Sequence, residues 1–118
     1  MLEAADTIFT KALVKGLQFG VDTSDVDAAV ITCANVVTLI TQAGAAETRT
    51  LENGAEGQVK ILINTVYAAA TVVAAKLLAG TGITFGAAGH AWMGVFAGGV
   101  WHTLATGIIT GDGGPTVG

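Results

Sequence analysis

A long stretch without charge limits what this chain can fold into. From Leu77 to Thr110 there is no Asp, Glu, Lys or Arg, and a stretch of that length either crosses a bilayer or is covered by protein. Its second half, residues 86–109, carries six glycines and a single leucine, and each glycine weakens a helix. The stretch also contains His90 and His102, and no cluster of Lys or Arg flanks it to set an orientation in a membrane. The pattern favours covered strands, with a small membrane protein kept as an alternative.

The scarcity of charge extends to the whole chain. Charged residues make up 12% of the 118 residues, whereas about a quarter of a soluble domain is charged. Hydrophobic residues make up 52%, so part of the surface is expected to be covered by another protein. The net charge of −4 argues against a nucleic-acid partner, because such a partner requires a basic surface. The length suits a single domain.

The apolar residues favour strands. Thr, Val and Ile together outnumber Leu by about four to one, which is a strand-forming bias. Alternation and glycine turns predict strands at residues 36–42, 47–51, 57–65, 82–85, 90–96 and 99–104. The last two flank "AGG" and are expected to form a hairpin. Two stretches leave helix and strand open, because 64–80 begins with Asn64 and is rich in alanine, and 24–37 opens with capping-box spacing.

Several of these strands are apolar on both faces. In "GQVKILINT" the period of two places Val59, Ile61 and Ile63 on one face and Lys60, Leu62 and Asn64 on the other. We expect Ile61 to lie in the domain core and Leu62 to lie at an interface between subunits. A free two-layer sandwich needs only one apolar face per strand. The chain is therefore predicted to be part of an assembly.

The segment "LENGAEGQVKILINTVYAAATVVAAKLLAGTGITFGAAGHAWMGVFAGGVWHTL" resembles bacteriophage capsid decoration (cement) proteins and related virion β-domains. The similarity is one of order and spacing over roughly residues 36–109, from a Leu-x-x-Gly turn through "EGQVKILIN" and "LLAGTGITF" to "VWHTL". It implies an all-β domain, a β-sandwich or jelly-roll-like fold, and a homotrimer. It also implies a virion protein, made in the host cytoplasm, that binds the major capsid protein on the outside of the head and reinforces it. A domain of a phage tail fibre or receptor-binding protein is the first alternative.

The expected organisation has three parts. Residues 1–20 form an arm that grips the capsid or a neighbouring subunit, residues 21–110 form the β-domain, and residues 111–118 form a flexible, glycine-rich tail. Trp92 is interpreted equally well as a contact residue or as a core residue. The residues expected at a subunit or capsid interface are Leu62, Trp92, Phe9, Leu13 and Leu17.

The sequence contains no set of residues typical of catalysis or metal binding. His90 and His102 have no Cys, Asp or Glu in their uncharged stretch to complete a metal site. "DTSDVD" at 22–27 lacks the glycine and glutamate of a calcium loop, so a turn capped by Asp is the better interpretation. Cys33 lies in an apolar run and is expected to be a buried thiol. The prediction is a protein without enzymatic activity, metal or cofactor.

Overall fold

The protein folds as one continuous β-sheet. The computed structural model describes residues 17–41, 47–66, 70–78, 80–107 and 114–118. The strands are β1 (Val21–Ser24), β2 (Val30–Ile31), β3 (Val37–Ile40), β4 (Glu47–Leu51), β5 (Gln58–Asn64), β6 (Ala70–Leu77), β7 (Gly80–Phe85), β8 (Ala91–Ala97), β9 (Val100–Gly107) and β10 (Thr116–Val117). No helix occurs among the described residues, so the all-β prediction is confirmed there. The two ambiguous stretches contribute strands and no helix over their described residues.

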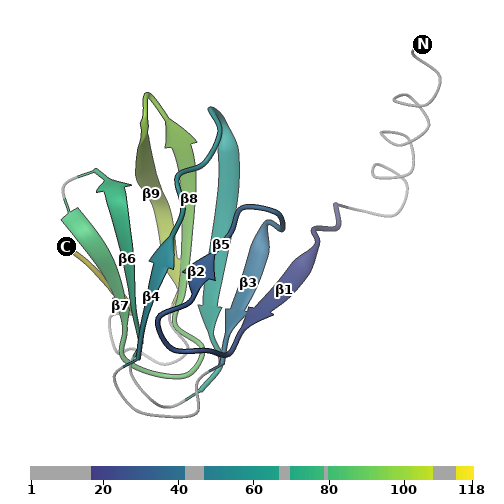
Figure 1. Cartoon of the computed structure of the whole chain (residues 1–118), viewed down its shortest axis with the longest axis vertical. Coiled ribbons are helices and arrows are strands. Elements are labelled where there is room, and N and C mark those ends of the chain that lie inside the picture. Colours follow the sequence, from purple (N-terminus) through teal and green to yellow (C-terminus); the bar gives the residue numbers. More distant parts are fainter. Residues whose placement is uncertain (1–16, 42–46, 67–69, 79, 108–113) are drawn as a thin grey trace.

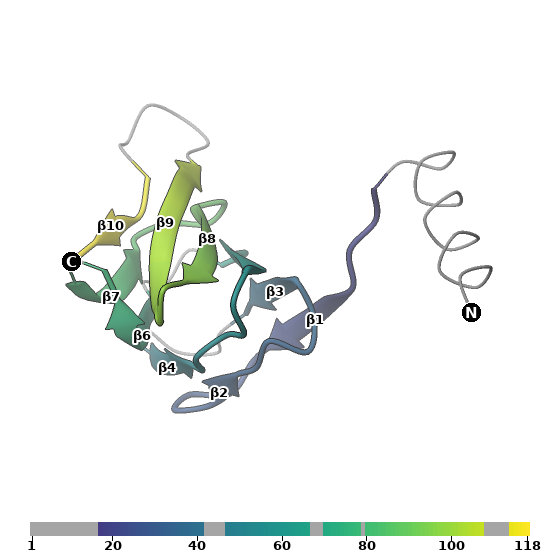
Figure 2. The same cartoon turned by 90° about the horizontal axis from the view of Figure 1, so that it is seen from above.

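The first six strands alternate between two halves of the sheet. β1, β3 and β5 pair in parallel in one half, and β2, β4 and β6 pair in parallel in the other. The β8–β9 hairpin continues from β5, while β7 pairs with β6 and with β10. The halves meet where Leu77 of β6 pairs with Trp101 of β9, and Figures 1 and 2 show the sheet curling into a barrel-like shape. A single curved sheet thus takes the place of the two stacked sheets of the expected sandwich.

The predicted hairpin between β8 and β9 is confirmed. Ala97 pairs with Val100, and Gly98 and Gly99 between them have φ of 62° and 81°. Two consecutive positive φ values define the tight turn whose twist matches that of paired strands. Within β8, Gly94 is required for a different reason, since a Cβ there would collide with the Trp92 ring.

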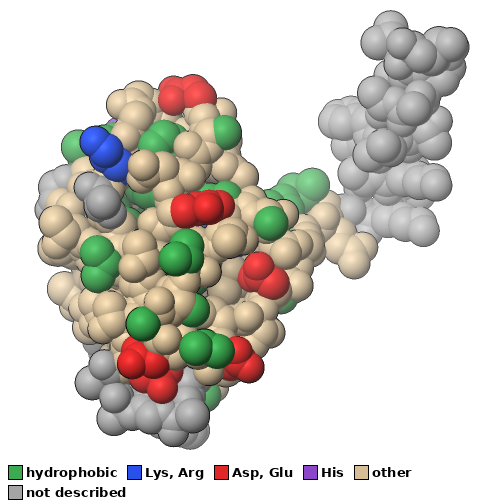
Figure 3. Space-filling model, viewed as in Figure 1, with side chains coloured by type: hydrophobic (Ala, Val, Ile, Leu, Met, Phe, Trp, Pro, Cys, Tyr) green, Lys and Arg blue, Asp and Glu red, His purple; other side chains and the backbone are tan. Residues whose placement is uncertain are grey.

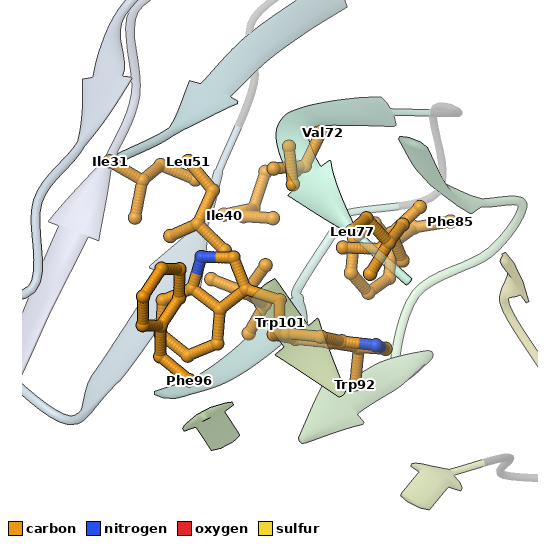
Figure 4. Close-up of a cluster of buried hydrophobic side chains, with 12 residues drawn as sticks. Ile31, Ile40, Leu51, Val72, Leu77, Phe85, Trp92, Phe96 and Trp101 are labelled. Atoms are coloured by element: carbon orange, nitrogen blue, oxygen red, sulfur yellow. The ribbon is translucent and has the colours of Figure 1, made fainter. Parts of the chain in front are cut away.

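Three aromatic side chains lie at the centre of the barrel (Figure 4). Trp92 and Trp101 meet edge to face with ring centroids 6.0 Å apart, and Phe96 contacts Trp101 at 5.3 Å. Both indole N–H groups have acceptors: Trp92 Nε1 donates to Thr103 Oγ1 at 2.9 Å, and Trp101 Nε1 donates to the Glu52 carbonyl at 3.1 Å. Buried tryptophans need such partners. The hydrogen bonds fix the orientation of the two rings in addition to the packing around them.

The inner and outer sides of β5 are the reverse of those expected. Leu62 is fully buried in the core cluster, as are Lys60 and Asn64 on the same side of the strand, whereas Ile61 is only partly covered on the outer side. The prediction that Ile61 belongs to the core and Leu62 to an interface is therefore wrong. The physical reason is that the two buried polar side chains donate hydrogen bonds to backbone carbonyls of loops, which offsets the cost of burying them. An alternation pattern does not reveal such hydrogen bonds.

One end of the described chain pairs with the sheet, and the other leads away from it. β10 pairs with β7, and Gly118 exchanges backbone hydrogen bonds with Gly82 at 3.0 Å. The flexible tail expected for 111–118 is therefore an edge strand over its described end. At the other end, residues 17–20 precede β1 and lead away from the barrel (Figures 1 and 2).

Candidate functional site

One half of the sheet has an outer surface without charge, which we call the apolar face. It is formed by the outward side chains of β3, β5 and β8: Val37, Leu39, Val59, Ile61, Ile63, Ala91, Met93 and Val95. All eight are partly exposed. All ten strands belong to one sheet whose inner side forms the core, so no second layer of described strands covers this surface.

The strand register joins these side chains into rows. One row crosses five strands and consists of Val21, Val37, Ile61, Met93 and Ala105. At about 4.8 Å between neighbouring strands, this row is about 19 Å long. Continuous apolar surfaces of this kind mark binding surfaces, whereas single exposed apolar residues do not.

The apolar face contains a hollow between β5, β8 and β9. Its volume is about 210 Å³, and its lining includes Ile61, Met93 and Ala105. These three point outward and are neighbours in one row of the register. The pairing of β8 with β9 shifts next to Met93, at a bulge between Met93 and Gly94, and bulges locally bend and twist a sheet. The hollow is large enough for one big apolar side chain, since a cavity of about 150 Å³ already holds a benzene ring.

The other half of the sheet presents what we call the threonine face. Its central row crosses β4, β6, β7 and β10 and consists of Thr48, Thr71, Thr84 and Thr116. Thr48, Thr84 and Thr116 are exposed, and Lys76 of β6 is exposed as well. The side of the molecule shown in Figure 3 has acidic side chains spread singly over it. This half also exposes the apolar side chains of Val30, Val73 and Leu78, but Thr50 separates Val30 from Val73 in their row. The apolar face is therefore the more continuous apolar surface of the two.

Lys60 holds a loop against the inside of the barrel. Its Nζ donates to the carbonyls of Thr32 at 2.8 Å and Asn35 at 2.7 Å. Burial lowers the pKa of the Lys60 ammonium below its ordinary value, although the Asp22 carboxylate opposes the shift. The amine thus serves as a structural donor for the β2–β3 connection, at the place where the sheet edges approach each other.

Arg49 on β4, in the other half of the sheet, is a second buried cation that hydrogen-bonds to neighbouring segments. Its Nε donates to Ser24 Oγ at 2.9 Å, and its Nη2 donates to the carbonyl of Thr41 at 3.0 Å and meets the Glu47 carboxylate at 3.1 Å. Arg49 is fully buried. The two buried cations therefore join the two halves of the barrel through these hydrogen bonds.

A second hollow of about 240 Å³ lies beside the seam between β1 and β2 and has Asp22, Ser24 and Thr38 in its lining. The Asp22 carboxylate accepts hydrogen bonds from Thr38 Oγ1 and Asn35 Nδ2, and Ser24 accepts from Arg49. These polar groups are occupied in joining strands. The turn predicted nearby is present at residues 26–29, where the backbone N–H of Ala29 donates to the Val26 carbonyl at 3.4 Å. The Asp27 carboxylate does not cap this turn by the hydrogen bond seen here, since it accepts from the backbone N–H of Thr48 on β4 at 2.9 Å.

Cys33 is partly buried next to Glu52, whose Oε1 accepts a hydrogen bond from the Cys33 backbone N–H at 2.5 Å. Burial, and to a smaller extent the Glu52 carboxylate, raises the pKa of the Cys33 thiol. A raised pKa keeps the group as the less reactive thiol at neutral pH. The geometry agrees with the interpretation of Cys33 as a structural residue.

The two histidines are used separately. The Nδ1 atom of His90 accepts from the backbone N–H of Gly86 at 3.1 Å, and His102 Nε2 lies 2.9 Å from the carbonyl of Ala97. His102 pairs with Val95 across the hairpin, whereas His90 precedes β8. Within the described ranges, no three His, Cys, Asp or Glu side chains gather as a metal site would require.

The predicted interface residues are separated by the fold. Leu62 and Trp92 are fully buried in the barrel core, so neither is available to a partner, and the interpretation of Trp92 as a core residue is correct. Leu17 is 75% exposed, and Phe9 and Leu13 lie outside the described residues. Sequence reasoning placed a second apolar surface on β5 but chose its wrong side, because the available signal was Lys60 and Asn64, which are usually exposed.

Known proteins offer no closer guide: the chain matches no protein-family model and no curated protein. Among the described residues there is also no helix of the length and hydropathy that a membrane crossing requires.

Proposed function

We propose that this protein is a structural protein that works as a symmetric homo-oligomer, and that it is a bacteriophage capsid decoration protein. It would bind as a trimer to the outer surface of the head and stabilise the shell by bridging major capsid proteins. The observation that carries the proposal is the uncharged apolar face of β3, β5 and β8, which the single chain leaves partly exposed.

The rest of the molecule supports a binding role over a chemical one. The polar groups at the seam are engaged with each other and with backbone carbonyls. The residue order over 36–109 that resembles decoration proteins supports placing the oligomer on a capsid. A decoration protein needs many modest contacts repeated by symmetry, because releasing one subunit then requires several contacts to break together.

Two measurements test the proposal. Light scattering of the purified chain should give the mass of a trimer, because a continuous uncharged face is typical of an interaction surface. Added to expanded phage heads stripped of their own decoration protein, the trimer should co-sediment with the heads and raise their disruption temperature. A monodisperse monomer would exclude the oligomer, and a trimer that leaves heads unbound and unprotected would exclude the capsid role.

A further inference from the structure

The first described residues carry apolar side chains that their own barrel does not cover. Leu17, Phe19 and Val21 alternate along the chain and are 75%, 39% and 56% exposed. In an extended segment, residues two apart project to the same side. Val21 begins the row that continues through Val37 and Ile61 on the apolar face. Residues 17–21 comprise the described end of the arm expected at 1–20 and the first residue of β1, and they alone are called the arm from here on. They present an apolar stripe with no charged residue.

The arm and the hollow of the apolar face complement each other. The hollow of about 210 Å³ between β5, β8 and β9 has Ile61, Met93 and Ala105 in its lining, and the arm offers two large apolar side chains, Leu17 and Phe19. Neither surface includes a charged group, so bringing them together removes apolar area from water without burying a charge.

The arm cannot fill the hollow of its own chain. Val21 and Met93 belong to the same row and are separated by three strand spacings, or about 14 Å. Two residues extend at most about 7 Å, so the backbone of Phe19 does not reach the strand that carries Met93. Leu17 would reach only by running straight across the strands, whereas residues 17–20 lead away from the barrel in both views (Figures 1 and 2).

We infer that the arm of a second copy of this chain occupies the hollow, with Leu17 and Phe19 as its apolar contacts. The inference rests on the self-association in the proposed function and names the surfaces that make it.

The arrangement constrains the symmetry. The arm and the hollow are different surfaces, so each copy gives one arm and accepts another in a head-to-tail contact. Such contacts close into rings when the rotation between copies allows it. A trimer is therefore a closed ring of three arm exchanges.

Disulfide trapping tests the exchange directly. In a Cys33→Ser background, Leu17→Cys is combined with Ala105→Cys at the hollow, and mild oxidation is followed by non-reducing gel electrophoresis. We expect covalent dimers and trimers. The matched control combines Leu17→Cys with Thr84→Cys on the threonine face, where no linked species should form. Equal linkage in both pairs, no linkage at Ala105, or a disulfide within one chain would overturn the inference.

A second pair of variants measures the contact without oxidation. Leu17→Asp should raise the dissociation constant of the oligomer at least about tenfold, which corresponds to about 1.4 kcal/mol in total. Val26→Asp, at another exposed apolar residue, should change it less than about twofold. If the oligomer persists while Leu17→Asp has no effect, only the arm exchange is wrong. If the unmodified chain is a monomer, the proposed oligomer itself is wrong.

Discussion

The two halves of the barrel are built alike inside and differently outside. Each half contains three parallel strands with alternating inner and outer side chains, and the inner side carries buried residues on every strand but β1, where the inner residues are partly covered. On β3, β5 and β8 the outer residues are aliphatic or methionine, whereas on β4, β6 and β7 the central outer row is threonine. Both residue types are strand formers, so the difference is not required by the fold.

The comparison of the two outer faces distinguishes side chains that the fold requires from side chains that we propose serve assembly. Threonine has the β-branched side chain that suits a strand, and its hydroxyl stays hydrated on the outer side of the sheet. The central outer row of the half with β4 and β6 is made of such residues. In the half with β5, every outer position of the central strands carries an apolar side chain in place of threonine. We propose that a partner covers these apolar groups, and each of the following substitutions tests one side of this contrast.

The largest expected effect separates the inner from the outer side of β5. Leu62→Ala should lower the free energy of unfolding by about 2–5 kcal/mol, because it leaves a cavity in the core. Ile61→Ala should cost only about 1 kcal/mol in the single chain, because the residue is partly exposed. Denaturant titration at low protein concentration measures both. Equal losses would contradict the assignment of the two sides.

The next effect compares the two outer faces. Ile61→Lys places a charge in the middle of the apolar face and should dissociate the oligomer, since an interface does not tolerate an unpaired buried charge. Thr84→Lys is the matched control on the threonine face and should leave the mass unchanged. Analytical ultracentrifugation over a concentration series measures both. Dissociation by Thr84→Lys with an intact Ile61→Lys oligomer would move the interface to the opposite half.

The strands could be predicted from sequence, whereas the side of β5 that faces the core could not. Each strand expected from alternation and glycine turns is present, and Gly98 and Gly99 mark the hairpin. The failure at Leu62 has a definite cause. A strand with Val59, Ile61 and Ile63 on one side and Lys60, Leu62 and Asn64 on the other is normally buried on its first side. Here Lys60 and Asn64 are inside because loop carbonyls accept their hydrogen bonds.

The closure of the sheet into a barrel-like shape could not be predicted from the sequence either. Alternation along one strand says which side faces inward, but it carries no information on which strand lies next to it. The contact of β6 with β9 depends on one paired position, Leu77 with Trp101, and on a register shift in β6 after Val73. The apolar surface itself was predicted, and only its residues had to be corrected.

A third, smaller effect concerns the buried cation beneath the apolar face. Lys60→Met should lower the free energy of unfolding by about 1–3 kcal/mol at neutral pH, because the carbonyls of Thr32 and Asn35 lose their donor. Lys76→Met, at an exposed lysine of β6, should change it by less than about 0.5 kcal/mol. Thermal unfolding of the three proteins gives the comparison, and equal effects would exclude a structural role for Lys60.

The pH dependence of the same pair has a defined sign. The pKa of Lys60 is lowered in the folded chain, so between that value and the ordinary lysine pKa of about 10.4 the unfolded chain binds more protons. Stability from this residue therefore rises as pH increases through that window. Relative to Lys60→Met, the unmodified protein should gain stability toward alkaline pH. A difference that falls or stays constant would contradict the lowered pKa.

The smallest effect is expected where the threonine face is made more apolar. Thr71→Val and Thr84→Val, neighbours in one row, exchange two hydroxyls for methyl groups of similar shape. Because Val and Thr are both strand formers and Thr84 is exposed, the double variant should change the free energy of unfolding by less than about 0.5 kcal/mol per site. Its mass should also stay that of the unmodified protein, since two methyl groups add little to the several hundred Å² that an apolar interaction surface requires. Sedimentation velocity would detect larger species, and their appearance would mean that the two faces differ only in degree.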